Sequence, residues 1–227
     1  MSVEINTRHK FEKVGVITNF PQILTTITGG DYTAGNGAVI TFPSGSTTDN
    51  LIVFVISCDA NQTFSVCDGT GWTIETQLSE SFNAVAGCVV WKILDGEGDN
   101  LSICWDNGNQ ESSWIGYRIT GFDTGDPMTV TSADGGLTTN FDPPANTGLG
   151  GALDYLWIAA ACADEDIIAT VAPSDFSGLL TANGGEAGGS TVSTATREHN
   201  TGDAYNPGAF TSAQIRWVSF TIIVNPL

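Results

Sequence analysis

Basic residues are scarce in this chain of 227 residues. Seven Lys and Arg face 25 Asp and Glu, which gives a formal net charge of −18 at pH 7 and an isoelectric point near 4.1. Proteins that bind nucleic acid meet the phosphate backbone with Lys and Arg, and anionic membrane surfaces attract polybasic segments. The composition therefore argues against nucleic acid and against a membrane as partners.

The chain also lacks long apolar runs and paired cysteine motifs. No stretch reaches the roughly 18 consecutive apolar residues of a membrane span, and residues 1–10 have no apolar core, so we expect no signal peptide. The cysteines are odd in number and lack C-x-x-C spacing, which argues against a zinc ribbon and a thioredoxin motif. We expect them to be free, buried thiols in a reducing cytosol. They are Cys58, Cys67, Cys88, Cys104 and Cys162.

Catalytic motifs are absent from the sequence. A Ser-His-Asp triad needs a histidine, and only His9 and His199 are available, with no G-x-S-x-G in the chain. No phosphate-binding G-x-x-x-x-G-K-[ST] occurs either. We therefore expect no enzymatic activity. A glycan-cleaving enzyme with paired carboxylates is the remaining catalytic alternative, but most acidic residues lie in turns.

Short strands separated by turns fill the sequence. Runs rich in β-branched and aromatic residues alternate with Gly- and Pro-containing segments, and the chain has 27 Gly and 8 Pro but no long helical periodicity. The pattern predicts an all-β fold built as a sandwich. The clearest strands lie at 39–42, 51–56, 88–94, 101–105, 114–120, 156–162 and 215–224.

An internal repeat relates the two parts of the chain. Its anchor pairs are Asp49 and Asp154 at an offset of 105, Trp72 and Phe176 at 104, and Trp114 and Trp217 at 103. Two arrangements fit: two small sandwiches in tandem, or one jelly-roll-like sandwich in which strands of the halves interleave. We favour the single sandwich, with an N-terminal arm and leading segment at 1–37 and a body at 38–227, whose halves cover about 38–125 and 126–227.

Four motifs stand out in the first half of the chain: the Asp-Asn-Leu-Ile-Val-Phe-Val run at 49–55, Gly-Trp-Thr at 71–73, Val-Trp-Lys at 90–92 and the Trp-Ile-Gly-Tyr-Arg-Ile-Thr-Gly-Phe run at 114–122. Together they resemble β-sandwich domains of tailed-phage virion proteins. The resemblance covers residues 38–226. It implies a structural part of a virus particle, either a head decoration or a tail or fibre element.

One acidic loop is a candidate calcium site. Asp95, Glu97 and Asp99 alternate in this loop, and Asp106 follows eleven residues after Asp95. Calcium prefers several oxygen ligands close together. The loop does not match an EF-hand, because its sixth position is not glycine. The alternative is a hydrated acidic rim, and we expect no other cofactor.

The few basic residues are unevenly distributed. Arg8, Lys10 and Lys13 lie together near the start, so residues 1–13 carry a net charge of +1 and the rest of the chain −19. With Phe11, these residues are the candidate partner-binding segment, which would tether the protein to an acidic neighbouring surface. The alternative is a solvated terminus.

These observations lead to a functional hypothesis. A strongly acidic body would be repelled by packaged DNA, so a virion protein of this composition belongs on the outer capsid surface after synthesis in the host cytoplasm. We expect a non-enzymatic decoration or cement protein that binds the major capsid protein and forms homo-oligomers, with a trimer favoured. The alternative is a tail or fibre module that binds host-surface glycans.

Overall fold

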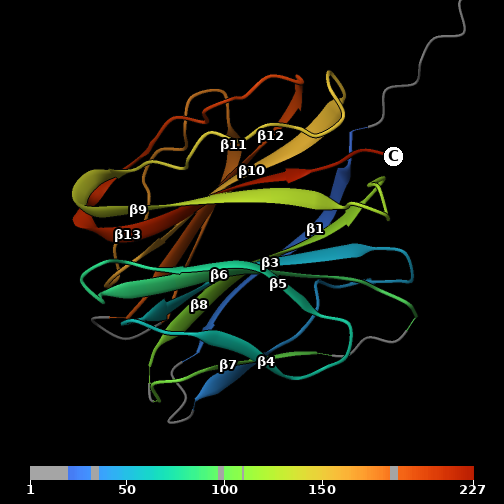
Figure 1. Ribbon diagram of the computed structural model, residues 1–227. Coiled ribbons are helices and arrows are strands. Elements are labelled where there is room, and N and C mark those ends of the chain that lie inside the picture. The colour runs from blue at the N-terminus through green and yellow to red at the C-terminus, as the bar shows by residue number, and fades with distance from the viewer. Residues whose placement is uncertain (1–19, 32–35, 97–99, 109, 185–188) are drawn as a thin grey trace, which may run out of the picture.

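The computed structural model describes residues 20–31, 36–96, 100–108, 110–184 and 189–227. All regular secondary structure in these ranges is β-strand (Figure 1). The strands are β1 (Gln22–Asp31), β2 (Gly37–Ile40), β3 (Leu51–Asp59), β4 (Phe64–Asp68), β5 (Thr73–Ser79), β6 (Val85–Ile93), β7 (Leu101–Trp105), β8 (Ser112–Thr120), β9 (Met128–Phe141), β10 (Asp154–Ala163), β11 (Ser177–Asn183), β12 (Thr191–Asn200) and β13 (Phe210–Val224).

The strands form two five-stranded sheets and a small third sheet. The first sheet has the order β1-β8-β3-β6-β5, the second β11-β12-β10-β13-β9, and the third β2-β7-β4. Figure 1 shows the two large sheets as stacked layers, with the third sheet on the far side of the first. The predicted all-β sandwich is confirmed.

Burial explains which strands lie at the centre of each large sheet. Strand β3 is buried at eight of its nine residues, and β10 is buried along its whole length. A strand with both faces covered reads as a continuous apolar run, and both sequences do. Edge strands such as β1 alternate between exposed and half-buried residues instead.

The main core lies between the two large sheets. Val53 and Ile115 of the first sheet belong to one apolar cluster with Ile158 and Phe220 of the second. Tyr117 and Thr194 join their hydroxyl groups across the interface at 2.5 Å. This buried hydrogen bond satisfies two polar groups that would otherwise be costly inside an apolar core.

The outer faces of the two sheets are covered differently. Phe54 and Ile56 of the first sheet pack against Ile103 and other residues of the third sheet. On the second sheet, Trp157 packs among residues of the connecting segments, including Phe176. A regular layer covers one face and loops cover the other.

The two halves of the chain do not interleave. Strands of the first sheet come from residues 22–120 and those of the second from residues 128–224, so the expected interleaving is corrected. The central strand of each sheet, β3 or β10, pairs on both sides with strands of its own half, which keeps the two halves in separate sheets. Each half therefore supplies one layer of the sandwich.

The two large sheets nevertheless share one strand order and one register. Reading the second sheet from its other edge gives β9-β13-β10-β12-β11, which matches β1-β8-β3-β6-β5 position by position. Leu51 pairs with Ile93 and Ile119, and the residues 105 positions later, at 156, 198 and 224, pair in the same way. Trp114 and Trp217 are not equivalent, since they lie opposite Ile56 and Ala163, two positions apart in this register.

The boundary drawn at residue 38 is wrong in one respect. Residues 22–31, assigned to the leading segment, form β1 and pair with β8 along their length. The alternating pattern of Gln22–Asp31 is weaker in apolar residues than that of the central strands, so the sequence alone does not identify it as a strand of the sandwich. The basic segment at 8–13 lies outside the described residues.

Two of the five cysteines form a disulfide, which the sequence does not predict. Cys67 and Cys104 form a disulfide between β4 and β7, with their Cα atoms 5.8 Å apart, so the expectation of free thiols is wrong for these two. Cys67 is the extra residue of a bulge in β4, which brings it beside β7. Cys58, Cys88 and Cys162 are free and buried as predicted, and burial raises the pKa of the Cys162 thiol to about 12.

The disulfide should stabilise the outer three-stranded sheet. The double variant Cys67→Ser/Cys104→Ser is expected to lose about 2–4 kcal/mol of unfolding free energy, because the closed loop of the unfolded chain is released. Urea denaturation with and without reductant measures this. Reductant should destabilise the wild type by a similar amount and leave the variant unchanged. Equal midpoints for the variant and the oxidised wild type would contradict the assignment.

Candidate binding site

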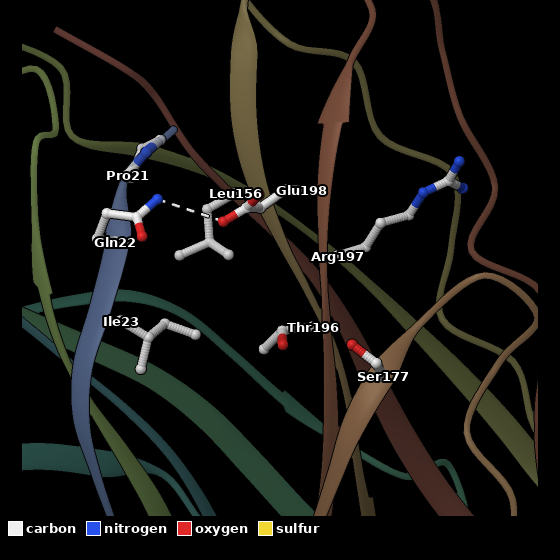
Figure 2. Close-up of a pocket in the computed structure, with 8 residues that line it drawn as sticks. All are labelled: Pro21, Gln22, Ile23, Leu156, Ser177, Thr196, Arg197 and Glu198. Atoms are coloured by element: carbon white, nitrogen blue, oxygen red, sulfur yellow. Dashed lines mark hydrogen bonds between the residues drawn. The ribbon is translucent and has the colours of Figure 1, made fainter. Parts of the chain in front are cut away.

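A cavity of about 310 Å³ opens at the seam between the two large sheets. It lies where edge strand β1 of the first sheet meets β12 and β11 of the second (Figure 2). Its volume is at the lower end of the range for small-molecule sites. The lining residues are Pro21, Gln22, Ile23, Leu156, Ser177, Thr196, Arg197 and Glu198.

Strand alternation sets the directions of the lining side chains. On β12, Thr196 and Glu198 share the face of Thr194, which points into the sandwich, and Arg197 lies on the opposite face. Figure 2 shows the Arg197 side chain running away from Gln22 and Glu198. One hydroxyl, of Thr196, and one carboxylate, of Glu198, therefore face the cavity from this strand.

Polar groups of the cavity surround an apolar floor. The Gln22 amide Nε2 donates to Glu198 Oε1 at 3.2 Å and to the Phe20 carbonyl oxygen at 3.0 Å. Ile23 and Leu156 supply the apolar surface between the sheets. An amide, a carboxylate and hydroxyls over an aliphatic floor suit a neutral ligand that carries several hydroxyl groups.

On the outer face of β12, Arg197 belongs to an aromatic cluster. Its guanidinium lies 4.7 Å from the Tyr205 ring centre, donates to the Tyr205 hydroxyl, and approaches Asp175 at 3.6 Å. His199 contacts the Tyr205 ring at 5.0 Å between centres. Burial and the Arg197 charge lower the pKa of His199, which favours its neutral form.

Two carboxylates occupy equivalent ends of the central strands. Asp59 ends β3, and Asp164 follows β10 at the position 105 residues later. Each accepts a hydrogen bond from the next backbone N–H, from Ala60 at 2.7 Å and from Glu165 at 3.0 Å, and both of these residues have positive φ. Burial first, and then the Asp59 charge, raise the pKa of Asp164 to about 6.

A buried ion pair lies near these carboxylates. Arg216 Nη1 donates to Glu80 Oε1 at 2.8 Å, and the Glu80 side chain is fully buried. The Phe82 ring, itself 68% exposed, stacks on the Arg216 guanidinium. Within the described residues, no group of three or more acidic, cysteine or histidine side chains is arranged to hold a metal ion.

The predicted calcium loop is only partly described. Asp95 is exposed after β6, and Asp106 follows β7, where it accepts a hydrogen bond from the Thr63 backbone N–H at 2.9 Å. That bond lowers the pKa of Asp106. Glu97 and Asp99 lie outside the described residues, so calcium binding by this loop stays a prediction. Arg8, Lys10, Phe11 and Lys13 also lie outside them.

The basic side chains of the described body are all buried or bound to other groups of the fold. Lys92 is buried at 3% exposure, and Arg118 Nη1 donates to the Ser44 carbonyl oxygen at 2.7 Å. Arg197 and Arg216 make the contacts given above. No other Lys or Arg occurs in the described ranges. The surface of this body is therefore dominated by carboxylates.

Comparison with protein-family models, curated proteins and solved structures yields no match. The part of the chain that the structure describes contains no helix able to span a lipid bilayer. The function must therefore be argued from the site and the surface of this chain.

The seam cavity was not foreseen from the sequence. Its lining combines residues 21–23 with residues 156–198, and residues 21–23 fell within the predicted leading segment. No local motif links these parts of the chain, because they meet only when the two sheets stack. The alternation of polar residues at the end of β12 was the only sequence signal.

The raised pKa of Asp164 should make stability depend on pH. Its folded value of about 6 exceeds the reference 3.8, so the folded state binds an extra proton between these values and stability falls as pH rises through 6. Asp164→Asn should therefore flatten the loss of unfolding free energy between pH 5 and 7. We expect about 1 kcal/mol or less, because the half-buried group is screened by solvent.

Chemical denaturation at several pH values measures this effect. Asp166→Asn is the matched control, because it removes the same charge from an exposed neighbour. The same pH slope in both variants would show that overall charge, rather than the Asp164 site, sets the dependence.

Proposed function

We propose that this protein is a structural component of a tailed-phage particle that decorates the outer face of the capsid. The observation that carries the proposal is the charge of the body, whose described Lys and Arg side chains are all buried or paired within the fold. Such a surface repels DNA and favours a partner that offers basic or neutral groups. The major capsid protein is the proposed partner.

The edges of the sandwich favour closed assemblies. In each large sheet, both edge strands carry a bulge opposite their neighbours: β1 and β5 in the first sheet, β9 and β11 in the second. Bulges disturb the hydrogen-bonding edge and oppose open-ended strand pairing. Copies would then associate through faces and tethers, which suits a closed oligomer such as a trimer on a capsid symmetry axis.

Binding to capsids tests the proposal directly. The purified protein should bind stoichiometrically to heads stripped of it, measured by co-sedimentation and electron microscopy. The variant Arg8→Glu/Lys10→Glu/Lys13→Glu should bind at least about tenfold more weakly, because its tether would be repelled by the acidic body of a neighbouring copy on the head. The charge-preserving variant Arg8→Lys/Lys10→Arg/Lys13→Arg is the control. Absence of head binding at any salt concentration would overturn the proposal.

A second candidate function is binding of host-surface glycans, and the seam cavity favours it. Its hydroxyl, amide and carboxylate groups over Ile23 and Leu156 match the surface of a sugar ring. Wild-type protein should bind a glycan in an array screen and in calorimetry.

Gln22→Ala/Glu198→Gln should weaken that glycan binding about tenfold, through lost hydrogen bonds to charged and amide groups. Asp203→Asn, an exposed change elsewhere, is the control. Glycan binding that is equal in both variants would place the ligand outside this cavity, and no binding would exclude the candidate.

A further inference from the structure

A smaller cavity of about 150 Å³ lies beside the end of β13. It is formed by the turn between β8 and β9, the segment before β10 and the residues after β13. Its volume is below the range of small-molecule sites and suits a single side chain. The lining residues are Asp123, Asp126, Leu149, Gly150, Leu153, Tyr155, Asn225 and Pro226.

Hydrogen bonds hold this cavity in shape. Asn225 joins two of its walls, since its side-chain Nδ2 donates to the Asp126 carbonyl oxygen at 2.8 Å and its carbonyl oxygen accepts from the Asp123 backbone N–H at 2.9 Å. Tyr155 fixes the opposite wall: its hydroxyl accepts from the Gly150 N–H at 2.8 Å and donates to the Gly151 carbonyl oxygen at 2.9 Å. The cavity is therefore preorganised.

The chemistry of the lining combines aliphatic walls with two carboxylates. Leu149 and Leu153 are 61% and 42% exposed, so both offer aliphatic surface to a side chain that enters the cavity. Asp123 and Asp126 are exposed at the rim, and Asp123 Oδ1 accepts the Gly125 N–H at 2.8 Å. Apolar walls below paired carboxylates fit the long aliphatic stem and cationic head of Lys or Arg.

The described body does not supply that cation. Its four basic side chains are buried or paired elsewhere, as shown above. The remaining basic residues of the chain are Arg8, Lys10 and Lys13. These three residues precede the described body and are the candidate source of the cation.

The described part of the chain begins close to the cavity. The Phe20 carbonyl oxygen lies 3.7 Å from the point that a Cβ atom would occupy at Gly121, and Gly121 is two residues before Asp123. Figure 1 shows the start of β1 at the same end of the sandwich as the C-terminus. Lys13 precedes Phe20 by seven residues, which span up to about 25 Å when extended. A short tether of this kind gives an effective concentration near the millimolar range.

We propose that this cavity is the docking site for a basic side chain from residues 8–13 of the same chain. The carboxylates of Asp123 and Asp126 pair with the cation, and Leu149, Leu153 and Pro226 pack along its stem. The inference goes beyond the capsid role and does not depend on it. In the free protein, the tether would then rest on its own acidic body instead of binding indiscriminately.

Limited digestion of the full-length protein with trypsin tests the docking. Trypsin cleaves after Lys and Arg, and the other basic residues lie in the folded body, so early cleavage reports on residues 8–13. Asp123→Asn/Asp126→Asn should raise the initial cleavage rate about fivefold, because two exposed ion pairs are lost. The control Asp95→Asn/Asp203→Asn removes the same charge from other exposed turns and should cleave like the wild type.

Two further arms make the result decisive. Leu149→Ser/Leu153→Ser should also speed cleavage, because it removes the apolar walls but keeps both carboxylates. The wild-type rate should stay constant over about a hundredfold range of protein concentration, as docking within one chain requires. Equal rates in all variants would overturn the proposal, and protection that grows with concentration would overturn it in favour of a second copy as the source.

Discussion

The packing of two doubly buried strands, β3 and β10, governs the rest of this structure. Each lies at the centre of its sheet, with one face in the shared core and the other face turned outward. Because both faces are apolar, the sandwich alone cannot shield them from water. The outer covers, the third sheet and the long connecting segments, follow from this requirement.

The two large sheets share one strand order, but their outer faces are covered by different structures. Strand order and central register coincide at an offset of 105 residues. In the first half, β2 and β7 pair as a ladder that ends with Ile40 opposite Leu101. The second half has an isolated bridge between Asn146 and Tyr205, which are 105 residues after the next pair of positions in that ladder, 41 and 100. The second half thus keeps the sheet but replaces the outer ladder with loops. Those loops supply Asp175 and Tyr205, the partners of Arg197, and one wall of the smaller cavity.

Charge is the other organising feature of the molecule. Carboxylates crowd the surface, and two of them, Asp59 and Asp164, repel each other strongly enough to contribute to a raised pKa at Asp164. The body uses its few cations internally, above all in the buried pair of Arg216 and Glu80. The remaining surface carboxylates create a negative electrostatic potential, which repels polyanions and attracts basic segments. Both proposals made above depend on this field.

The fold class, the central strands and the acidic character follow from the sequence, because hydrophobic alternation and composition are local properties of the chain. The burial of Cys58, Cys88 and Cys162 followed in the same way from their apolar runs. Tertiary structure alone decided that each half forms its own sheet, that β1 joins the first sheet, and that Cys67 meets Cys104. It also created both cavities, since their linings come from segments far apart along the chain. Such contacts depend on how the layers stack, and a pattern read along one strand carries no information about its partner across the sandwich.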